Sequence, residues 1–215
     1  MRTRLAAFDM DGTLVDVMSS WAYVHQHFGE ENSEALALFL ADRIDDDEFI
    51  RRDIALWWRH DPEISTATLA RILAPVPLMP GARELFRGLH AAGVETAIVS
   101  GGIDLLAERV GRELGIPHVL ANGFRTDARG RLTGEPVVRV PIRRKGEVLR
   151  ALRERLGVPA EATAAVGNSD IDAAMFAESG RSVAFCPADD HVRARAAKIL
   201  TEPDLAACLP YLLNG

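Results

Sequence analysis

The segment of residues 5–15 constrains the fold of this chain more than any other part of the sequence. Residues 5–8 form a short apolar run that is typical of a buried strand. Asp9 and Asp11 follow directly, and Gly12 then interrupts the extended pattern. Residues two apart on a strand share a face, so both carboxylates are expected to project from the same end of a sheet. Two like charges held so close need compensation, and an oxygen-preferring divalent metal ion is the simplest source of it.

The composition fits one large domain, or one domain that carries a smaller insertion, in a chain of 215 residues. The hydrophobic fraction of 48% and charged fraction of 26% are ordinary for a globular protein with a sizeable core. A net charge of −6 argues against a general nucleic-acid or membrane-surface binder, and no segment is long and apolar enough to span a bilayer. Cys186 and Cys208 fit neither a CxxC pair nor a disulfide framework, so a reducing cytoplasm is the expected compartment.

Residues 16–76 show no convincing strand pattern, and their apolar residues recur at helical spacing. The acidic run at residues 45–48 predicts a helix N-terminus, since it lacks the glycine and the alternation of a calcium loop. Prolines at 75, 77 and 80 then punctuate the chain. We therefore expect a helical cap over residues 16–76 and a core formed by residues 1–15 and 77–215. Four apolar stripes support the helices: Trp21, Val24 and Phe28; Leu36, Phe39 and Leu40; Phe49, Ile54 and Trp57; Leu69, Ile72 and Leu73.

From Gly81 onward the pattern alternates between helix and strand. Repeated strand–helix units predict an α/β fold, namely a doubly wound, Rossmann-like parallel sheet with a small helical cap inserted after its first strand. A polar excursion with turn signals separates the two halves of this pattern after residue 121. Ligands of such sheets bind beyond the carboxyl ends of the strands. The predicted helices cover residues 83–92, 103–114, 144–156 and 171–178, and the predicted strands cover residues 94–99, 118–121, 163–166 and 182–185.

Polar residues fall at the predicted strand ends. Ser100 follows one strand, and Asn168, Asp170 and Asp172 follow another, while Lys145 begins a helix on the same side. The Ser-Gly-Gly sequence that starts at Ser100 leads into a helix N-terminus, where exposed amides hold an anion. We therefore expect a phosphate-binding site, because these residues supply oxygen ligands for a metal, a hydroxyl, an ammonium group and backbone amides.

Each of these features also has a structural explanation. Asp-Gly is a common turn pair, Ser-Gly-Gly occurs in ordinary loops, and Lys145 beside two arginines is typical of a solvated helix start. Asp170 and Asp172 can cap the helix that follows them. The joint placement of these residues at strand ends favours the functional interpretation.

The sequence resembles the haloacid dehalogenase superfamily of phosphatases over nearly its whole length. The signatures stand as Asp9-Met-Asp11-Gly-Thr13, then Ser100, then Lys145, then Gly167-Asn168-Ser169-Asp170-Ile171-Asp172. The helical insertion is most similar to that of the phosphoserine phosphatase branch, as are the segments at residues 99–102, 121–122 and 132–134. The second carboxylate, Asp11, favours phosphatases over the dehalogenases of the same superfamily.

The resemblance implies Mg²⁺-dependent hydrolysis of a small phosphorylated metabolite. Asp9 would attack phosphorus and form an aspartyl-phosphate, and Asp11 would act as general acid and then as general base. The cap would exclude water from the reacting phosphate and set specificity. The implied phosphate-binding residues are Thr13, Ser100, Gly101 and Lys145, and the implied metal-binding residues are Asp9, Asp11, Asn168 and Asp172.

Two departures from the family pattern matter. Asn168 stands where the family has a metal-binding aspartate, so one negative charge is lost; Asp172, or else Asp170, is expected to restore it. Met18 stands where phosphoserine phosphatases have a substrate-binding glutamate, and neither Arg51 nor Arg52 aligns with their cap arginine. This second departure argues against phosphoserine as the substrate.

Met18, Trp21 and Arg52 are the candidate specificity residues. Met18 and Trp21, with Trp57 and Trp58, line an apolar or cation-accepting pocket in one interpretation and simply pack the cap in the other, which we favour.

Two further functions compete with hydrolysis: phosphoryl transfer to an alcohol, and phosphate or partner binding without turnover, which Asn168 favours. A phosphate-accepting signalling receiver is a third alternative, but the cap-sized insertion after Thr13 argues against it. The expected partner is a small metabolite rather than nucleic acid or a membrane, and the expected assembly is a monomer or homodimer.

Overall fold

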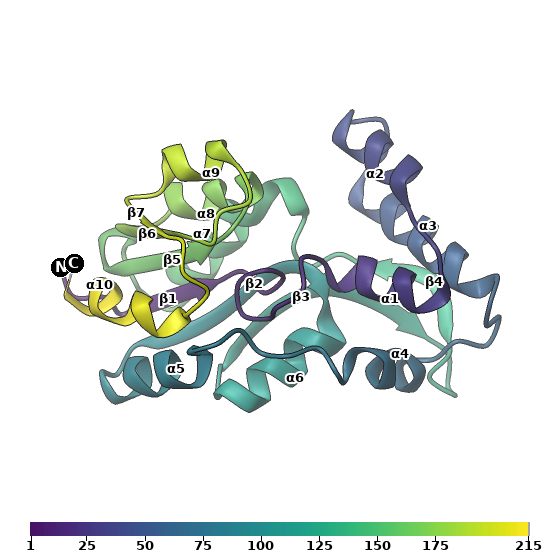
Figure 1. The fold of residues 1–215 in the computed structure, drawn as a ribbon, viewed down its shortest axis with the longest axis horizontal. Coiled ribbons are helices and arrows are strands. Elements are labelled where there is room, and N and C mark those ends of the chain that lie inside the picture. The colour runs from purple at the N-terminus through teal and green to yellow at the C-terminus, as the bar shows by residue number, and fades with distance from the viewer. Residues whose placement is uncertain (215) are drawn as a thin grey trace.

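The computed structural model describes residues 1–214, in which seven strands form one sheet with the order β4-β3-β2-β1-β5-β6-β7 (Figure 1). The central strand, β1, pairs in parallel with β2 on one side and with β5 on the other. Its placement in the middle of the sheet explains why residues 5–8 are apolar on both faces. The strands are β1 (Leu5–Phe8), β2 (Glu95–Ile103), β3 (His118–Thr126), β4 (Leu132–Val137), β5 (Thr163–Gly167), β6 (Arg181–Phe185) and β7 (Lys198–Leu200).

Helices cover both faces of the sheet, as the doubly wound prediction requires (Figure 1). Ala6 and Phe8 of β1 face the side that packs against α5 (Ala82–Ala91) and α6 (Asp104–Leu114), and Phe8 lies 4.9 Å from Phe86 between ring centroids. Leu5 and Ala7 face the opposite side. That side is covered by α7 (Lys145–Arg155), α8 (Ala173–Ala177) and α9 (Asp190–Arg195), and α10 (Leu209–Asn214) lies beside α5.

Residues 16–76 contain four helices, α1 (Ser20–Phe28), α2 (Ser33–Leu40), α3 (Asp46–Trp58) and α4 (Thr66–Leu73). The predicted helix start at the acidic run is confirmed, because the Asp45 carboxylate accepts a hydrogen bond from the Glu48 amide. The packing of these helices is continuous with the core, since Trp57 lies within 5.8 Å of Phe124 on β3 between ring centroids. The stripe at residues 36–40 lies on α2 as predicted, with Phe39 buried and Leu36 and Leu40 46% and 66% exposed.

The polar excursion after residue 121 differs from the prediction. Residues 118–126 form one long strand, and β4 pairs with it in antiparallel orientation, so the sheet is not wholly parallel. β4 is an edge strand with one solvated face, and it therefore carries no apolar run that would identify it. β2 also runs through Ser100 and both following glycines, which moves the start of α6 to Asp104.

Of the helices in the described part of the chain, none has the length and apolarity needed to cross a bilayer.

Candidate active site

A tight turn after β1 places the two acids of the first signature. The amides of Thr13, Leu14 and Val15 all donate to the Met10 carbonyl, which folds the chain back sharply after the strand. Gly12 permits this turn because its φ is +72°, a value that favours glycine. A Cβ atom on Gly12 would lie 2.2 Å from the side-chain nitrogen of Asn168, so the glycine also allows the amide to approach.

Lys145 links the end of β1 to the fourth signature. Its ammonium donates to Asp9 Oδ1 at 2.7 Å and to Asp172 Oδ1 at 2.8 Å, and all three side chains are buried. Burial raises the pKa of Asp9 to about 7, and the charge of Lys145 opposes that rise. Burial alone would lower the pKa of Lys145, but the carboxylates of Asp172 and Asp9 raise it above its ordinary value. The ammonium therefore stays charged.

Both carboxylate oxygens of Asp172 accept hydrogen bonds from other groups of the protein. Its Oδ2 accepts hydrogen bonds from the backbone amides of Asn168 and Ser169 and from the Ser169 hydroxyl, while Oδ1 holds Lys145. This geometry makes Asp172 the residue that positions Lys145, and it does not support the expectation that Asp172 ligates a metal. Asp170 lies apart from the site, because its carboxylate pairs with Arg195 at 2.7 Å.

Asp11 is held by the start of α1. Its Oδ2 accepts hydrogen bonds of 2.8 Å from both the amide and the hydroxyl of Ser20, at a helix N-terminus that favours negative charge. Within residues 1–214, its Oδ1 is buried and has no hydrogen-bond partner. Burial raises the pKa of Asp11, and the hydrogen bonds from Ser20 oppose that rise. A carboxyl with a raised pKa and one unengaged oxygen is suited to carry a proton.

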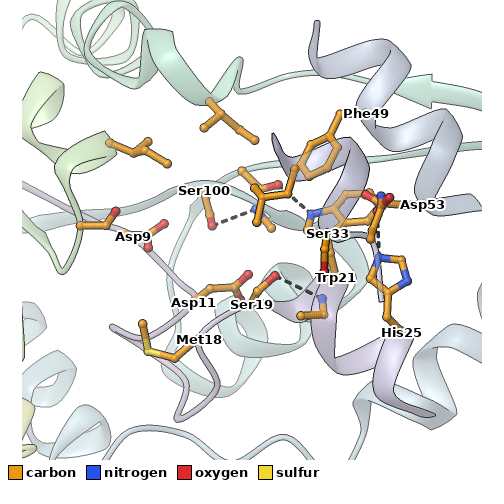
Figure 2. Close-up of a pocket in the computed structure, with 18 of the residues that line it drawn as sticks. Asp9, Asp11, Met18, Ser19, Trp21, His25, Ser33, Phe49, Asp53 and Ser100 are labelled. Carbon is orange, nitrogen blue, oxygen red and sulfur yellow. Dashed lines mark hydrogen bonds and ion pairs between the residues drawn. The ribbon is translucent and has the colours of Figure 1, made fainter. Parts of the chain in front are cut away.

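The strand β2 brings Ser100 and Gly101 to the same space. Ser100 Oγ accepts a hydrogen bond from the Gly102 amide at 3.1 Å, which leaves its hydroxyl hydrogen free to donate to a ligand. The Gly101 carbonyl accepts from Trp21 Nε1 at 3.0 Å and so connects this loop to the cap. Figure 2 shows Asp9, Asp11 and Ser100 directed toward one shared space. Thr13 is not among the residues that line this space, and its hydroxyl is buried with no partner in the described chain.

A cavity of about 580 Å³ extends from these groups to the helices α1, α2 and α3. Met18 and Trp21 line it, as the sequence predicts for specificity residues. Arg52 does not line it and instead pairs with Glu48 at 2.8 Å. Trp57 and Trp58 are packing residues, as favoured: Trp57 is fully buried, and Trp58 lies against Gly134.

The wall residues that were not predicted from the sequence include His25 on α1 and Phe49 and Asp53 on α3 (Figure 2). The sequence does contain a signal for Asp53. The buried face of α3 includes Ile50, Asp53, Ile54 and Trp57, which places an acid inside an otherwise apolar stripe.

The oxygen donors of the site fit Mg²⁺. Across residues 1–214 no cluster of three or more His, Cys, Asp or Glu side chains could hold a metal ion. The carboxylates of Asp9 and Asp11 do line one cavity with the amide of Asn168, and Asp11 Oδ1 is unpartnered among the described residues. Mg²⁺ is commonly held by one or two carboxylates together with water and substrate phosphate, so these donors suffice.

The fold and this arrangement of residues together define an α/β hydrolase of the haloacid dehalogenase type. The model of the haloacid dehalogenase-like hydrolase family matches residues 6–177, which include all four signatures. The chain therefore belongs to the haloacid dehalogenase-like hydrolase family, and the resemblance seen in the sequence is confirmed.

Curated relatives place the chain among the phosphoserine phosphatase-like members of this family. It is 31% identical to a phosphoserine phosphatase of Wolinella succinogenes over 97% of this chain and 100% of that protein. It is 32% identical to a phosphoserine phosphatase of Streptomyces coelicolor over 98% of this chain, but it spans only 50% of that protein's length.

Solved structures agree on the fold. A structure described as a phospho-aspartyl intermediate analogue of phosphoserine phosphatase gives a TM-score of 0.82 at 24% identity, covering 99% of this chain and 100% of that one. A haloacid dehalogenase family hydrolase from Salmonella enterica serovar Typhi gives a TM-score of 0.84 at 20% identity, covering 100% of this chain and 72% of that one.

Proposed function

We propose that this protein is a Mg²⁺-dependent phosphatase that hydrolyses a small phosphorylated metabolite through an aspartyl-phosphate on Asp9. The observation that carries the proposal is the 2.7 Å contact between Lys145 Nζ and Asp9 Oδ1, in a cavity that Asp11 and Ser100 also line. The relatives named phosphoserine phosphatases support the same reaction class.

The two acids of the first signature divide the chemistry. Asp9 attacks phosphorus, the bond from phosphorus to the leaving oxygen breaks, and the leaving oxygen takes the proton of Asp11. Asp11 then takes a proton from the water that attacks the aspartyl-phosphate, which releases phosphate and restores both acids. The raised pKa of Asp11 supports the first of its two roles.

The phosphoryl group is held by Ser100, Gly101 and Lys145 in this proposal. The Ser100 hydroxyl donates to one phosphoryl oxygen, and the Lys145 ammonium neutralises the charge that develops there. Asp172 keeps that ammonium charged and in place. Thr13 stays a predicted phosphate-binding residue on the family resemblance alone.

Mg²⁺ would be held by Asp9, Asp11 and Asn168, and it would supply further neutralisation of the phosphoryl oxygens when bound. Asn168 contributes an amide oxygen where the family has a carboxylate, so we expect weaker metal binding than three carboxylates give. Asp172 is omitted from the proposed ligand set because both of its oxygens are engaged.

We also propose that residues 16–76 act as a cap over a core of residues 1–15 and 77–215. The free thiols of Cys186 and Cys208 are compatible with a reducing cytoplasm as the compartment. The partner is a small phosphorylated metabolite, with no role for nucleic acid or membrane, and the assembly is a monomer or homodimer.

The test is hydrolysis of p-nitrophenyl phosphate in the presence of Mg²⁺. We expect activity that is lost in Asp9→Asn and on chelation of the metal. Phosphate binding without turnover would instead favour the binding-only alternative, which the family assignment does not favour. Transfer of the phosphoryl group to an added alcohol rather than to water would favour a phosphotransferase.

A further inference from the structure

The cap side of the cavity is acidic. Asp53 of α3 and Glu30 and Glu31, in the connection between α1 and α2, line it. Lys145 is the only lysine or arginine among the wall residues of the described chain, and Asp9 and Asp172 already hold it. Glu30 is already paired with His60 at 2.8 Å and with Arg59 at 3.9 Å. The part of a substrate that extends from the phosphate toward α3 therefore meets the negative charge of Asp53 and Glu31.

Asp53 has one carboxylate oxygen without a partner. Its Oδ1 accepts hydrogen bonds from His25 Nε2, at 2.8 Å, and from the side-chain amide of Asn32. Its Oδ2 accepts no hydrogen bond from any residue between 1 and 214. The residue is only 1% exposed and lines the cavity opposite Asp9 and Ser100 (Figure 2). An acceptor oxygen on the cavity wall is thus left for a ligand.

His25 does not neutralise this carboxylate. The indole nitrogen of Trp57 lies 2.9 Å from His25 Nδ1 and can only donate, so Nδ1 is an acceptor and carries no proton. The single imidazole proton therefore sits on Nε2, and it is donated to Asp53. The imidazole is neutral in this arrangement, and Asp53 has no cation beside it.

A buried carboxylate without a cation is costly. Burial raises the pKa of Asp53, and its interactions with His25 and Asn32 oppose that rise only in part. A ligand that brings a positive charge and an N–H donor to Oδ2 would complete both the charge balance and the hydrogen bonding of the site.

We propose that the leaving group of the substrate carries a primary or secondary amine, whose ammonium donates to Asp53 Oδ2, and that it carries no carboxylate. The inference rests on the phosphatase function proposed above and specifies its substrate class: the phosphate monoester of an amino alcohol. Trp21 and Phe49 supply apolar surface along the same cavity for the carbon chain of such a group.

The same wall disfavours phosphoserine. Its carboxylate would approach Asp53 and Glu31, and the wall residues of the described chain include no arginine to receive it. Arg52, the cap arginine considered from the sequence, is paired with Glu48 instead. A quaternary ammonium group is also a poorer fit than a primary amine, because it has no N–H to donate to Oδ2.

A matched two-carbon series tests the proposal. We would compare kcat/KM for 2-aminoethyl phosphate, ethyl phosphate and phosphoglycolate, with phosphoserine, phosphocholine, and 3-aminopropyl and 4-aminobutyl phosphates beside propyl and butyl phosphates. We expect an amine to exceed its alkyl counterpart by about tenfold or more at the best chain length, since a charge-assisted hydrogen bond gives that much. Phosphoglycolate and phosphoserine should fall below ethyl phosphate.

Hydrolysis of p-nitrophenyl phosphate distinguishes failure of the proposed phosphatase function from failure of the amine inference. Absence of Mg²⁺-dependent hydrolysis of this ester would overturn the phosphatase function itself. Its hydrolysis with no amine preference at any chain length, or with phosphoserine as the best substrate, would overturn only the amine inference.

Substitutions in the cavity wall test whether Asp53 recognises the amine of the substrate. In Asp53→Asn the ratio of kcat/KM for the amine to that for the matched alkyl ester should fall toward one, and this ratio does not depend on how much protein is folded. Glu31→Gln, at an exposed position on the cavity mouth, should lower the ratio by less. Glu34→Gln is the matched control, because Glu34 is exposed on α2 and does not line the cavity. An unchanged ratio in both Asp53→Asn and Glu31→Gln would overturn the proposal.

Discussion

Lys145 Nζ lies 2.7 Å from Asp9 Oδ1, so the start of α7 is tied to the end of the central strand by a buried ion pair between residues 136 positions apart. The same ammonium holds Asp172 after β5. One cation thereby joins three of the four sequence signatures at the carboxyl edge of the sheet, where parallel α/β folds bind their ligands.

Replacing this cation should cost both stability and activity. Lys145→Met leaves two buried carboxylates without their partner, which is expected to lower the free energy of unfolding by about 3–5 kcal/mol. Turnover should fall by about a hundredfold or more, because the phosphoryl charge loses its ammonium. Urea denaturation and p-nitrophenyl phosphate hydrolysis measure the two effects. Arg144→Met is the control, since Arg144 is exposed and its guanidinium pairs with Glu147. A comparable loss there would contradict the account.

Asp172→Asn distinguishes a positioning residue from a metal ligand. If Asp172 positions Lys145, kcat should fall while the Mg²⁺ concentration for half-maximal activity stays the same. A metal ligand would instead raise that concentration strongly. Asp170→Asn should change neither quantity, because Asp170 is exposed and pairs with Arg195.

Asn168→Asp should strengthen metal binding. The substitution keeps the size of the side chain and adds one negative charge beside Asp9 and Asp11, so the half-saturating Mg²⁺ concentration should fall by about tenfold. Without metal the added charge should lower the melting temperature, since three acids then lie close together. Mg²⁺ titration of activity and thermal denaturation with and without Mg²⁺ measure both effects. An unchanged Mg²⁺ requirement would remove Asn168 from the proposed ligand set.

The two thiols should differ in reactivity. Burial raises the pKa of Cys208 to about 12, so the native protein holds almost no reactive thiolate there at pH 8. Ellman's reagent should label only Cys186 in the native state, and slowly, because burial raises the pKa of that thiol as well. Both thiols should react in denaturant. Because burial raises the pKa of Cys208, its protonated thiol contributes to the free energy of unfolding. This contribution is lost as pH rises from about 9 through about 12. Rapid native labelling of Cys208 would contradict its placement.

Much of the catalytic edge could be predicted from the sequence. Asp9 and Ser100 each follow an apolar run directly, and Asp11 lies two residues beyond Asp9. The carboxyl ends of the strands in a parallel sheet converge on one edge whatever the loops do. The pairing of Lys145 with Asp172 could not be predicted, because it depends on the depth at which α7 packs against the sheet. The family resemblance suggested Asp172 as a metal ligand, whereas its three hydrogen bonds from residues 168 and 169 favour a positioning role.

The helices of residues 16–76 and their role in specificity were predicted, but Asp53 and His25 were not predicted as part of the binding surface. Asp53 and His25 meet because α1 and α3 pack side by side, and helical spacing gives no information on which faces of two helices meet. The antiparallel β4 was missed for a different reason. One face of β4 is solvated, so its sequence is polar and resembles that of a loop.

The most direct test of the central claim is to identify the residue that becomes phosphorylated during turnover. Acid quenching of the protein with a rapidly hydrolysed phosphate ester and Mg²⁺, followed by peptide mass spectrometry, should find the mass of one phosphoryl group on the peptide that contains Asp9. The label should be absent in Asp9→Asn and should accumulate in Asp11→Asn when an activated aryl phosphate is the substrate. A phosphoryl group on any other residue, or turnover that persists in Asp9→Asn, would contradict the account.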